Sequence, residues 1–582
     1  MTVFAGVCFR RAAGNLPDET KAELRRSISR TRGHEIREYS VRNTYVVNVD
    51  IGAYRDGGTV VDNAGLTLVA GDPILKTGAS RTSSSRLQDV EILHQRFARR
   101  DTSALCTASG TFSGVHIPRG AGMPFLFSDK VGVRQLFVAE QEDFVAFSTS
   151  LRVLEELSIL PKKLDYAGLT EQAELHWPVG RRTPYQGISL LEGAEVLYMG
   201  QELSSETYWS WPQTADRALS TEDHLQNCYE EFQNALRARL AGDTDILAFL
   251  SGGLDSRTVV TGLSNLGMKV HAVNYAPEGT QDRVYAERFA KVVGCDYLQM
   301  PFSPDLADSG NVHTAVRRFV LERHRAGELS LDRPNCIWTG NGGSVGLGHV
   351  YMNEGVVRAL DGGRVDEALK HYRKTERTDL TRKPLNKEVF QQYRKWPFTS
   401  LKDDLQRFEA EEPGRAFYFF LMANDQRRSL HGVFEDIDLH QLEFIMPFFD
   451  SDFLEAVAKV PIDECLYHRF YVRWIRCFGE AVSAVPWQSY PGHVPCPIED
   501  DPSLGYQFDS DYSSAWSNAK TAIRLRKARE MVTSKSFPHH ILSRSSIALA
   551  YVLGLARSKR LTYAIEKGYE YFRYWKVAAD QG

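Results

Sequence analysis

The chain has 582 residues, 43% of them hydrophobic and 25% charged, and this length predicts more than one domain. A formal net charge of −4 gives no electrostatic argument for nucleic acid or an anionic membrane as a partner. The eight cysteines are scattered without a Cys-x-x-Cys pair, no signal peptide pattern opens the chain, and the apolar run at 547–556 is about half the length of a membrane span. We therefore expect a cytoplasmic protein with reduced cysteines and a core helix at 547–556.

The first 205 residues are predicted to be rich in strands. Short β-like runs separated by polar or Gly/Pro turns lie at 3–9, 44–50, 66–70, 114–117, 135–140 and 145–148. Two helical patterns interrupt them, at 18–30 and 87–99. This alternation indicates a sandwich of sheets with helices outside.

From about residue 220 the pattern changes to long helices between apolar strands. Helices are predicted at 222–240, 258–266 and 282–293, and strands at 246–250, 269–275 and 296–300. This order is typical of an α/β unit with a doubly wound parallel sheet, which binds its ligand at the carboxyl ends of the strands.

A candidate phosphate site follows the first of these strands. The run 246–250 has no polar alternation, as in a strand buried on both faces, and Ser251-Gly252-Gly253-Leu254-Asp255-Ser256 comes next, before a helical pattern. Unpaired N–H groups at a helix N-terminus bind phosphate, glycines permit close backbone approach, and a carboxylate suits magnesium. The alternative is an ordinary strand-to-helix turn with an Asp or Ser N-cap.

The string from Ser251 to Ser256 resembles the pyrophosphatase-loop signature of enzymes that split ATP between its α and β phosphates to adenylate a substrate. It is not a Walker A loop, because no Gly-Lys-Ser/Thr follows the glycines. Residues 110–112, 129–136 and 147–150 are similar to the end of the glutaminase domain of asparagine synthetases, and 183–193 resembles the hinge that follows it. The resemblance to the asparagine synthetase superfamily implies a glutaminase-like domain of the N-terminal-nucleophile-hydrolase type at 1–205 and an ATP-binding synthetase domain at 206–582.

The N-terminal half departs from the family at the residues that make ammonia. Glutaminase activity in the family requires a Cys directly after the initiator Met, and here Thr2 takes that place. The family's Asn-Gly-Glu appears as Ala70-Gly71-Asp72, so an oxyanion amide is missing, and only Asp89 matches a pocket acid. We expect this domain to be inactive, with an amidohydrolase acting through Thr2 as the alternative.

In the synthetase half, the resemblance implies that backbone groups near Leu250 and Val273 hold adenine, and that 338–349 forms a second phosphate loop. Ser344 stands where the family has a magnesium-binding Asp, so Asp255 and ATP oxygens hold the metal alone, or another acid such as Glu354 reaches in, or the site is dead. Asp282 matches a family acid, although an acid favoured by the helix dipole is the preferred interpretation.

The stretch 439–450 resembles the family's Glu-x-Arg-x-Pro-Phe-Leu-Asp, which implies that Glu443 faces the substrate pocket as a base for the attacking amine. The alternative is a buried structural acid paired with an Arg such as Arg427 or Arg428. Relatives place a Lys near 487–497, but none matches here, and His493 and Arg469 are weak substitutes. The basic C-terminal helices are read as a tail packed on the body, or as a docking surface for a peptide or carrier.

These features predict an enzyme, an ATP-dependent amide ligase that adenylates a carboxylate for attack by an amine, with ATP and Mg²⁺ as cofactors. Peptide macrolactam or other natural-product amide formation is preferred; asparagine synthetase using ammonia or glutamine, and a catalytically silent scaffold, are the alternatives. We expect a small-molecule or peptide substrate and a precursor-peptide or protease partner, without nucleic acid or membrane. Asp255 and Glu443 are the predicted catalytic residues and Asp255 the metal ligand; the predicted nucleotide-binding residues are Leu250, Ser251, Gly252, Gly253, Asp255, Ser256, Val273, Gly340, Asn341 and Gly342.

Overall fold

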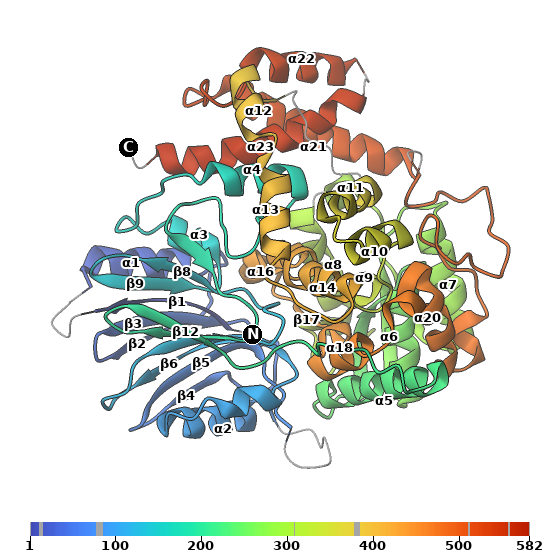
Figure 1. The fold of residues 1–582 in the computed structure, drawn as a ribbon, viewed down its shortest axis with the longest axis horizontal. Helices are drawn as coiled ribbons and strands as arrows, with labels where there is room; N and C mark the ends of the chain where they lie inside the picture. Colours follow the sequence, from blue (N-terminus) through green and yellow to red (C-terminus); the bar gives the residue numbers. More distant parts are fainter. Residues whose placement is uncertain are drawn as a thin grey trace.

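A computed structural model describes residues 2–10, 16–76, 85–307, 309–376, 384–509, 512–556 and 559–580. Figure 1 shows two stacked sheets from the N-terminal part of the chain, drawn in blue and teal, beside a helix-rich part drawn in green to orange. The C-terminal helices, drawn in red, lie across the top of both.

The N-terminal part contains two antiparallel sheets of six strands. The first has the order β10 (Ile188–Leu190), β8 (Phe137–Glu140), β9 (Phe144–Ser148), β1 (Thr2–Phe9), β3 (Thr44–Asp50) and β2 (Ile36–Val41). The second has the order β12 (Leu203–Thr207), β11 (Glu195–Met199), β7 (Phe125–Ser128), β6 (Thr111–Pro118), β5 (Gly65–Asp72) and β4 (Thr59–Val61). All six strands predicted in this part of the chain are confirmed, as β1, β3, β5, β6, β8 and β9.

The two predicted helices of this part are also present. Helix α1 (Asp18–Ser27) contacts α3 (Leu151–Glu155), and α2 (Arg86–Ala98) lies against β4, β5 and β6 of the second sheet. A capping box begins α2, because Ser85 accepts from the N–H of Gln88 while the Gln88 side chain accepts from the N–H of Ser85.

The helix-rich part is organised around a parallel sheet of five strands with the order β15 (Asp296–Gln299), β14 (Lys269–Asn274), β13 (Asp245–Phe249), β16 (Cys336–Trp338) and β17 (Glu443–Ile445). The chain runs outward from β13 through β14 to β15 and then returns to place β16 on the other side of β13. The strand order therefore reverses between β13 and β16, and such switch points are where open α/β sheets bind ligands.

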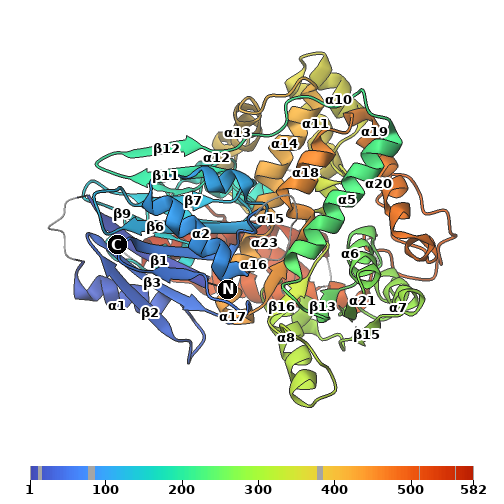
Figure 2. The ribbon, with the colours of Figure 1, turned by 90° about the horizontal axis from the view of Figure 1, so that it is seen from below.

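Helices flank this sheet, as Figure 2 shows for α5 (Thr221–Arg239), α6 (Leu254–Asn265) and α7 (Gln281–Val293). The predicted strands 246–250, 269–275 and 296–300 are confirmed to within one residue at each end. Helix α6 begins four residues before the predicted 258, because Leu254, Asp255 and Ser256 form its first helical turn. These residues end the candidate phosphate turn, residues 251–256, which is called the phosphate turn below. The three-residue strand β17 was too short to predict.

The C-terminal helices α21 (Ser514–Thr533), α22 (Arg544–Leu555) and α23 (Lys559–Ala579) pack on one another, and α23 contacts α4 (Tyr166–Leu175) of the N-terminal part. The prediction of a core helix at 547–556 is only half right. Ile547, Ala550 and Gly554 are buried, but Leu549, Val552 and Leu555 face outward with 58–59% of their surface exposed. Among the described residues no helix is long and apolar enough to cross a membrane.

Candidate functional site

A cavity of about 750 Å³ opens at the carboxyl ends of β13, β14 and β16, where the strand order reverses. It collects eight of the predicted nucleotide-binding residues, namely Leu250, Ser251, Asp255, Ser256, Val273, Gly340, Asn341 and Gly342. Gly252 and Gly253 belong to the same turn but do not themselves line the cavity. The residues that the sequence placed together are thus together in space.

The turn between β13 and α6 is held by its own polar groups. The N–H of Ser251 donates to the Ser256 hydroxyl at 2.9 Å, and the two serine hydroxyls lie 3.0 Å apart. Gly253 occupies the N-cap position of α6 in an extended conformation and provides no side-chain cap. The first-turn N–H groups of α6 therefore lack a side-chain acceptor, and with the positive end of the helix dipole they form a site suited to an anion.

The loop after β16 is pressed against this turn, and only glycines permit it. A Cβ on Gly340 would lie 2.6 Å from the backbone nitrogen of Ser256, and one on Gly343 would lie 2.7 Å from the Asp255 carboxyl carbon. Gly342 adopts a φ of +94°, a left-handed conformation that disfavours other residues. The turn 251–256 and the loop 340–343 therefore pack directly against each other, with the Asp255 side chain between them.

Asp255 is the acid at the centre of the site. Its carboxylate accepts a hydrogen bond from the Tyr471 hydroxyl at 2.6 Å and another from the N–H of Ser344. Burial raises its pKa to about 6, against an ordinary value of 3.8, while these two hydrogen bonds act in the opposite direction. Sequence reasoning missed Tyr471, a buried residue of α20 (Arg469–Trp474), because 216 residues separate it from its partner.

Asp282, the second residue of α7, also lines the cavity. Its carboxylate accepts from the N–H of Gly252 at 3.1 Å and from the hydroxyl of Tyr512 at 3.0 Å, and burial raises its pKa. Asp282 lies at the start of the helix as expected, and its side chain also holds the phosphate turn through the hydrogen bond from Gly252. Tyr512 and Trp516 reach the cavity from the C-terminal segment, which no pattern in the sequence connected with it.

No lysine or arginine lines this cavity among the described residues. His313 does, but burial lowers its pKa to about 4, so the ring is neutral at physiological pH. The two weak substitutes for the family Lys lie elsewhere: Arg469 donates to the carbonyls of Leu466 and Asp463, and His493 packs on His468 with ring centroids 4.4 Å apart. Among the described lining residues, the acidic side chains are those of Asp255 and Asp282.

Arg257, which directly follows Ser256, points away from the cavity. Its guanidinium donates to the carbonyls of Val482, Val485 and Pro486 at 2.8–3.1 Å and lies over the Phe289 ring. The N–H of Gln488 also donates to the carbonyl of Gly252 at 3.0 Å. The segment that contains Val485, Pro486 and Gln488 is therefore anchored to the back of the turn 251–256.

Glu443 does not face the cavity, and this corrects the prediction that it faces the substrate pocket. It is 1% exposed and forms an ion pair with Arg134 of the N-terminal part, with 3.2 Å between Nη1 and Oε1. The reason is the alternation of side chains along a strand: Phe444, the next residue of β17, lines the cavity, so Glu443 points to the opposite face. The alternative of a buried structural acid is the arrangement observed, with Arg134 rather than Arg427 or Arg428 as the partner.

Glu354, the acid considered as a further metal ligand, begins α10 (Glu354–Asp361), pairs with Arg358 on the same helix and does not line the cavity. Ser344 lines it and contributes its backbone N–H to Asp255. Within the described ranges no group of three or more His, Cys, Asp or Glu side chains is arranged to hold a metal. Asp255 and Asp282 are the carboxylates on the cavity wall that suit a hard cation.

The cavity wall beyond the phosphate turn is apolar and aromatic. The ring of His313 lies 5.0 Å from that of Phe444 and 6.3 Å from that of Phe249, and Leu430 and Val433 continue the same wall. Neutral hydrogen-bonding groups accompany it at Thr339, Gln426 and Ser429. Gln426 ends a π-helical turn, Met422–Gln426, a distortion often found at functional sites.

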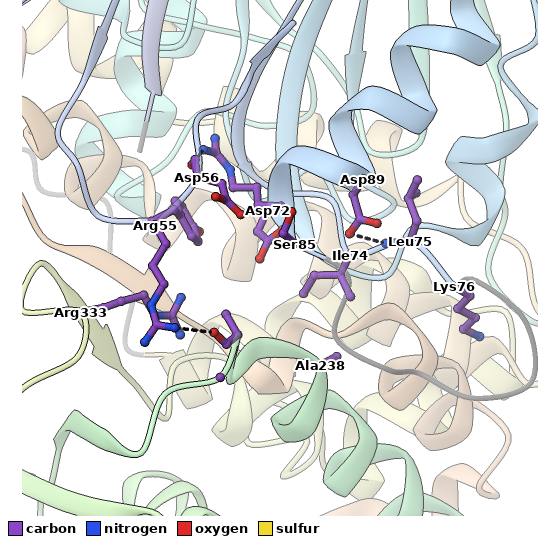
Figure 3. A pocket seen from close by; sticks show the side chains of 14 residues that line it. Arg55, Asp56, Asp72, Ile74, Leu75, Lys76, Ser85, Asp89, Ala238 and Arg333 are labelled. Carbon is purple, nitrogen blue, oxygen red and sulfur yellow. Dashed lines mark hydrogen bonds between the residues drawn. The ribbon is translucent and has the colours of Figure 1, made fainter.

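A second cavity of about 290 Å³ lies at the seam between the two parts of the chain (Figure 3). It brings together Asp72 and Asp89 with Arg333 across the seam, and of these acids Asp89 is the one that the sequence matched to the family's glutamine pocket. One Asp89 oxygen accepts from the N–H of Leu75 at 3.1 Å, and burial raises the pKa of Asp72. Thr2 is the first residue of β1, and its side chain lies outside the described residues.

The parallel sheet, its switch-point cavity and the helix N-terminus without a side-chain cap define an α/β protein with a turn suited to an anion. Sequence comparison supports the asparagine synthetase superfamily for this chain, because residues 227–322 match the family model of asparagine synthase. That match includes β13, the phosphate turn and α7.

A curated relative is similar to part of the chain. The glutamine-hydrolysing asparagine synthetase 3 of Bacillus subtilis is 24% identical over 179 residues, which cover 30% of this chain and 28% of that protein. Among solved structures, the B. subtilis glutamine phosphoribosylpyrophosphate amidotransferase complexed with ADP and GMP is 11% identical and covers 52% of this chain and 91% of its own, with a TM-score of 0.25. A structure described as the allosteric regulatory enzyme of purine biosynthesis is also 11% identical, covers 53% and 81% respectively, and has a TM-score of 0.26. Scores this low carry no argument about fold or function.

Proposed function

We propose that this protein is an ATP-dependent amide ligase that adenylates a substrate carboxylate, releases pyrophosphate and lets an amine attack the acyl-AMP. The observation that carries the proposal is the turn from Ser251 to Ser256 with the uncapped start of α6, opening on a 750 Å³ cavity at the switch point of the sheet. The superfamily assignment supports ATP-dependent ligase chemistry, and the AMP-forming step and the amide product are part of the proposal.

The described residues divide the work in this scheme. Backbone N–H groups at the start of α6 and in the loop 340–343 bind the phosphates, and the strand ends at Leu250 and Val273 border the adenine. The apolar wall with Thr339, Gln426 and Ser429 holds the acid next to the α-phosphate. Juxtaposition of the two reactants supplies a large part of the rate acceleration.

Magnesium fits the donor groups on the wall. Asp255 and Asp282 present carboxylate oxygens to the cavity, and these are the ligands that the ion prefers. A bound magnesium ion would neutralise charge on the phosphates and favour the departure of pyrophosphate. Because no described lysine or arginine lines the cavity, we expect the reaction to depend on the divalent ion completely.

The test is magnesium-dependent exchange of labelled pyrophosphate into ATP in the presence of candidate acids. Exchange that requires both the acid and magnesium, and that is lost in Asp255→Asn, supports the ligase. Binding of ATP without exchange for any acid, under conditions where the fold is intact by circular dichroism, refutes it.

A catalytically silent scaffold is the second candidate. It is favoured by the same lack of cations on the cavity wall and by Ser344 at the position of the family's metal-binding acid. Exchange distinguishes it from the ligase, whereas nucleotide binding alone does not. Asparagine synthesis from ammonia is tested in the same assay with aspartate and ammonium.

The N-terminal sandwich is proposed to be a degenerate, inactive glutaminase-like domain, so the amine comes from the substrate itself or from a second molecule. This favours intramolecular closure, such as a peptide macrolactam, with a precursor peptide or its protease as a partner. Cytoplasmic residence with reduced thiols is part of the same proposal, and all eight cysteines are free of disulfides.

A further inference from the structure

The charges around the large cavity restrict the acid that it can accept. Its wall carries the carboxylates of Asp255 and Asp282, a histidine that is neutral at physiological pH, and no cation within the described part of the chain. A substrate with a second carboxylate would bring an additional anion into a space that already holds two carboxylates and a polyphosphate. Without a counter-charge, such an anion pays both desolvation and like-charge repulsion.

Four arginines of neighbouring elements are held by other partners and do not supply that counter-charge. Arg134 is paired with Glu443 on the opposite face of β17, and Arg257 is bound to three backbone carbonyls. Arg428 donates to the carbonyls of Gly180 and Arg182, and Arg427 donates to the carbonyl of Leu191 at 2.7 Å. Both of these side chains are buried, with 3–5% of their surface exposed.

The rest of the cavity wall indicates which chemical groups the substrate acid should carry in place of a second carboxylate. Phe249, His313 and Phe444 form a contiguous aromatic surface, and Leu430 and Val433 extend it. The polar groups among them, Gln426 and Ser429, are neutral and can bond to amide groups. Ser429 also lines a separate cavity of about 750 Å³, in which arginines and acids balance: Arg30, Arg152, Arg428 and Arg573 with Glu155, Asp425, Glu435 and Asp436.

We infer that the acyl substrate is a monocarboxylate without a second anionic group, with an apolar or aromatic group next to the reacting carboxylate and amide-like polarity beyond it. A peptide or N-acyl amino acid with a hydrophobic residue at the activated carboxyl has this chemistry, whereas aspartate and other dicarboxylates do not. The inference rests on the proposed function, because it names the substrate class of that site.

The experiment compares matched pairs of acids in magnesium-dependent pyrophosphate exchange with the full-length protein. Suitable pairs are N-acetylphenylalanine with N-acetylaspartate, and hexanoate with adipate. We expect kcat/KM for the monocarboxylate to exceed that for its dicarboxylate partner by about 100-fold, which corresponds to ~2.7 kcal/mol. Equal or better use of the dicarboxylates overturns the inference while leaving the ligase intact, and no exchange with any acid overturns the proposed function itself.

A charge introduced on the apolar wall provides a second measurement. Val433 is partly exposed to the cavity, so Val433→Lys can be accommodated there, and Val433→Gln is the neutral control. We expect Val433→Lys to raise kcat/KM for N-acetylaspartate relative to N-acetylphenylalanine at least 10-fold over the Gln variant, through KM for the acid and without a change in KM for ATP. An unchanged ratio in the Lys variant would show that the missing cation does not set the specificity.

Discussion

The ion pair between Arg134 and Glu443 joins the two parts of the chain, and Glu443→Gln tests whether it is structural. Both side chains are 2% exposed, and one contact of 3.2 Å connects them. The substitution leaves the guanidinium buried opposite a neutral amide. Removal of one partner of a buried pair costs about 3–5 kcal/mol, and the amide still accepts a hydrogen bond, so we expect about 3 kcal/mol.

The assay is urea unfolding followed by tryptophan fluorescence, together with pyrophosphate exchange per folded molecule. Glu443→Gln should lower the unfolding midpoint and leave kcat within a few-fold of wild type. The double variant Arg134→Met with Glu443→Leu should recover most of the loss, because it removes both charges. Glu287→Gln is the control, since its pair with Lys291 is exposed and worth about 0.3–0.5 kcal/mol. Normal stability with kcat reduced 100-fold or more would instead make Glu443 a catalytic base.

Three further predictions concern the phosphate turn and the N-terminus. Asp255→Asn should abolish magnesium-dependent exchange, and in wild type exchange should decline as pH falls through about 6, where this carboxyl takes up a proton. The folded pKa of Asp255 lies above the ordinary 3.8, so its contribution to the stability of the nucleotide-free protein is full below about pH 4 and is lost as pH rises through about 6. Asp255→Asn should therefore raise the Tm at pH 8 and change it little at pH 4. An equal shift of the Tm at both pH values would contradict the raised pKa of Asp255. Gly340→Ala should eliminate nucleotide binding measured by calorimetry, because the added Cβ would lie 2.6 Å from the Ser256 nitrogen. The control Gly253→Ala should keep the fold and the Tm, because its added Cβ would lie 3.6 Å from the nearest atom. Equal tolerance of both substitutions would show that the loop 340–343 does not pack against the turn 251–256. Thr2→Ala should leave exchange unchanged, and hydrolysis of glutamine that disappears in this variant would revive the amidohydrolase alternative.

The phosphate turn could be predicted because all its determinants are local. A five-residue apolar strand, two glycines and a helix start are adjacent in sequence, and the structure has them as β13, the turn and α6. Long periodic helices such as α5 and α7 were predictable for the same reason. The loop 340–343 was identified by its glycines, and the contact of Gly340 with Ser256 gives those glycines a steric purpose.

The remainder of the site depends on contacts between distant residues. Tyr471 reaches Asp255 across 216 residues and Tyr512 reaches Asp282 across 230, and Trp516 lines the same cavity; each reads as an ordinary core aromatic in sequence. The prediction for Glu443 was wrong for a different reason: no strand was predicted at 443–445, and the face of a strand on which a residue lies changes with a shift of one position. In a strand of three residues no alternation is available to fix that phase.

The balance of charge in the cavity determines which form of the nucleotide it is expected to bind. The start of α6 contributes the equivalent of roughly half a positive charge, which is far less than a triphosphate carries. The two wall carboxylates add negative charge, and no described arginine or lysine offsets it. Two acids with pKa values raised by burial are destabilising in an empty cavity, and a divalent cation bound with the nucleotide would convert them into ligands. The site is therefore expected to bind the magnesium complex of the nucleotide, and removal of magnesium by EDTA should abolish ATP binding as well as exchange.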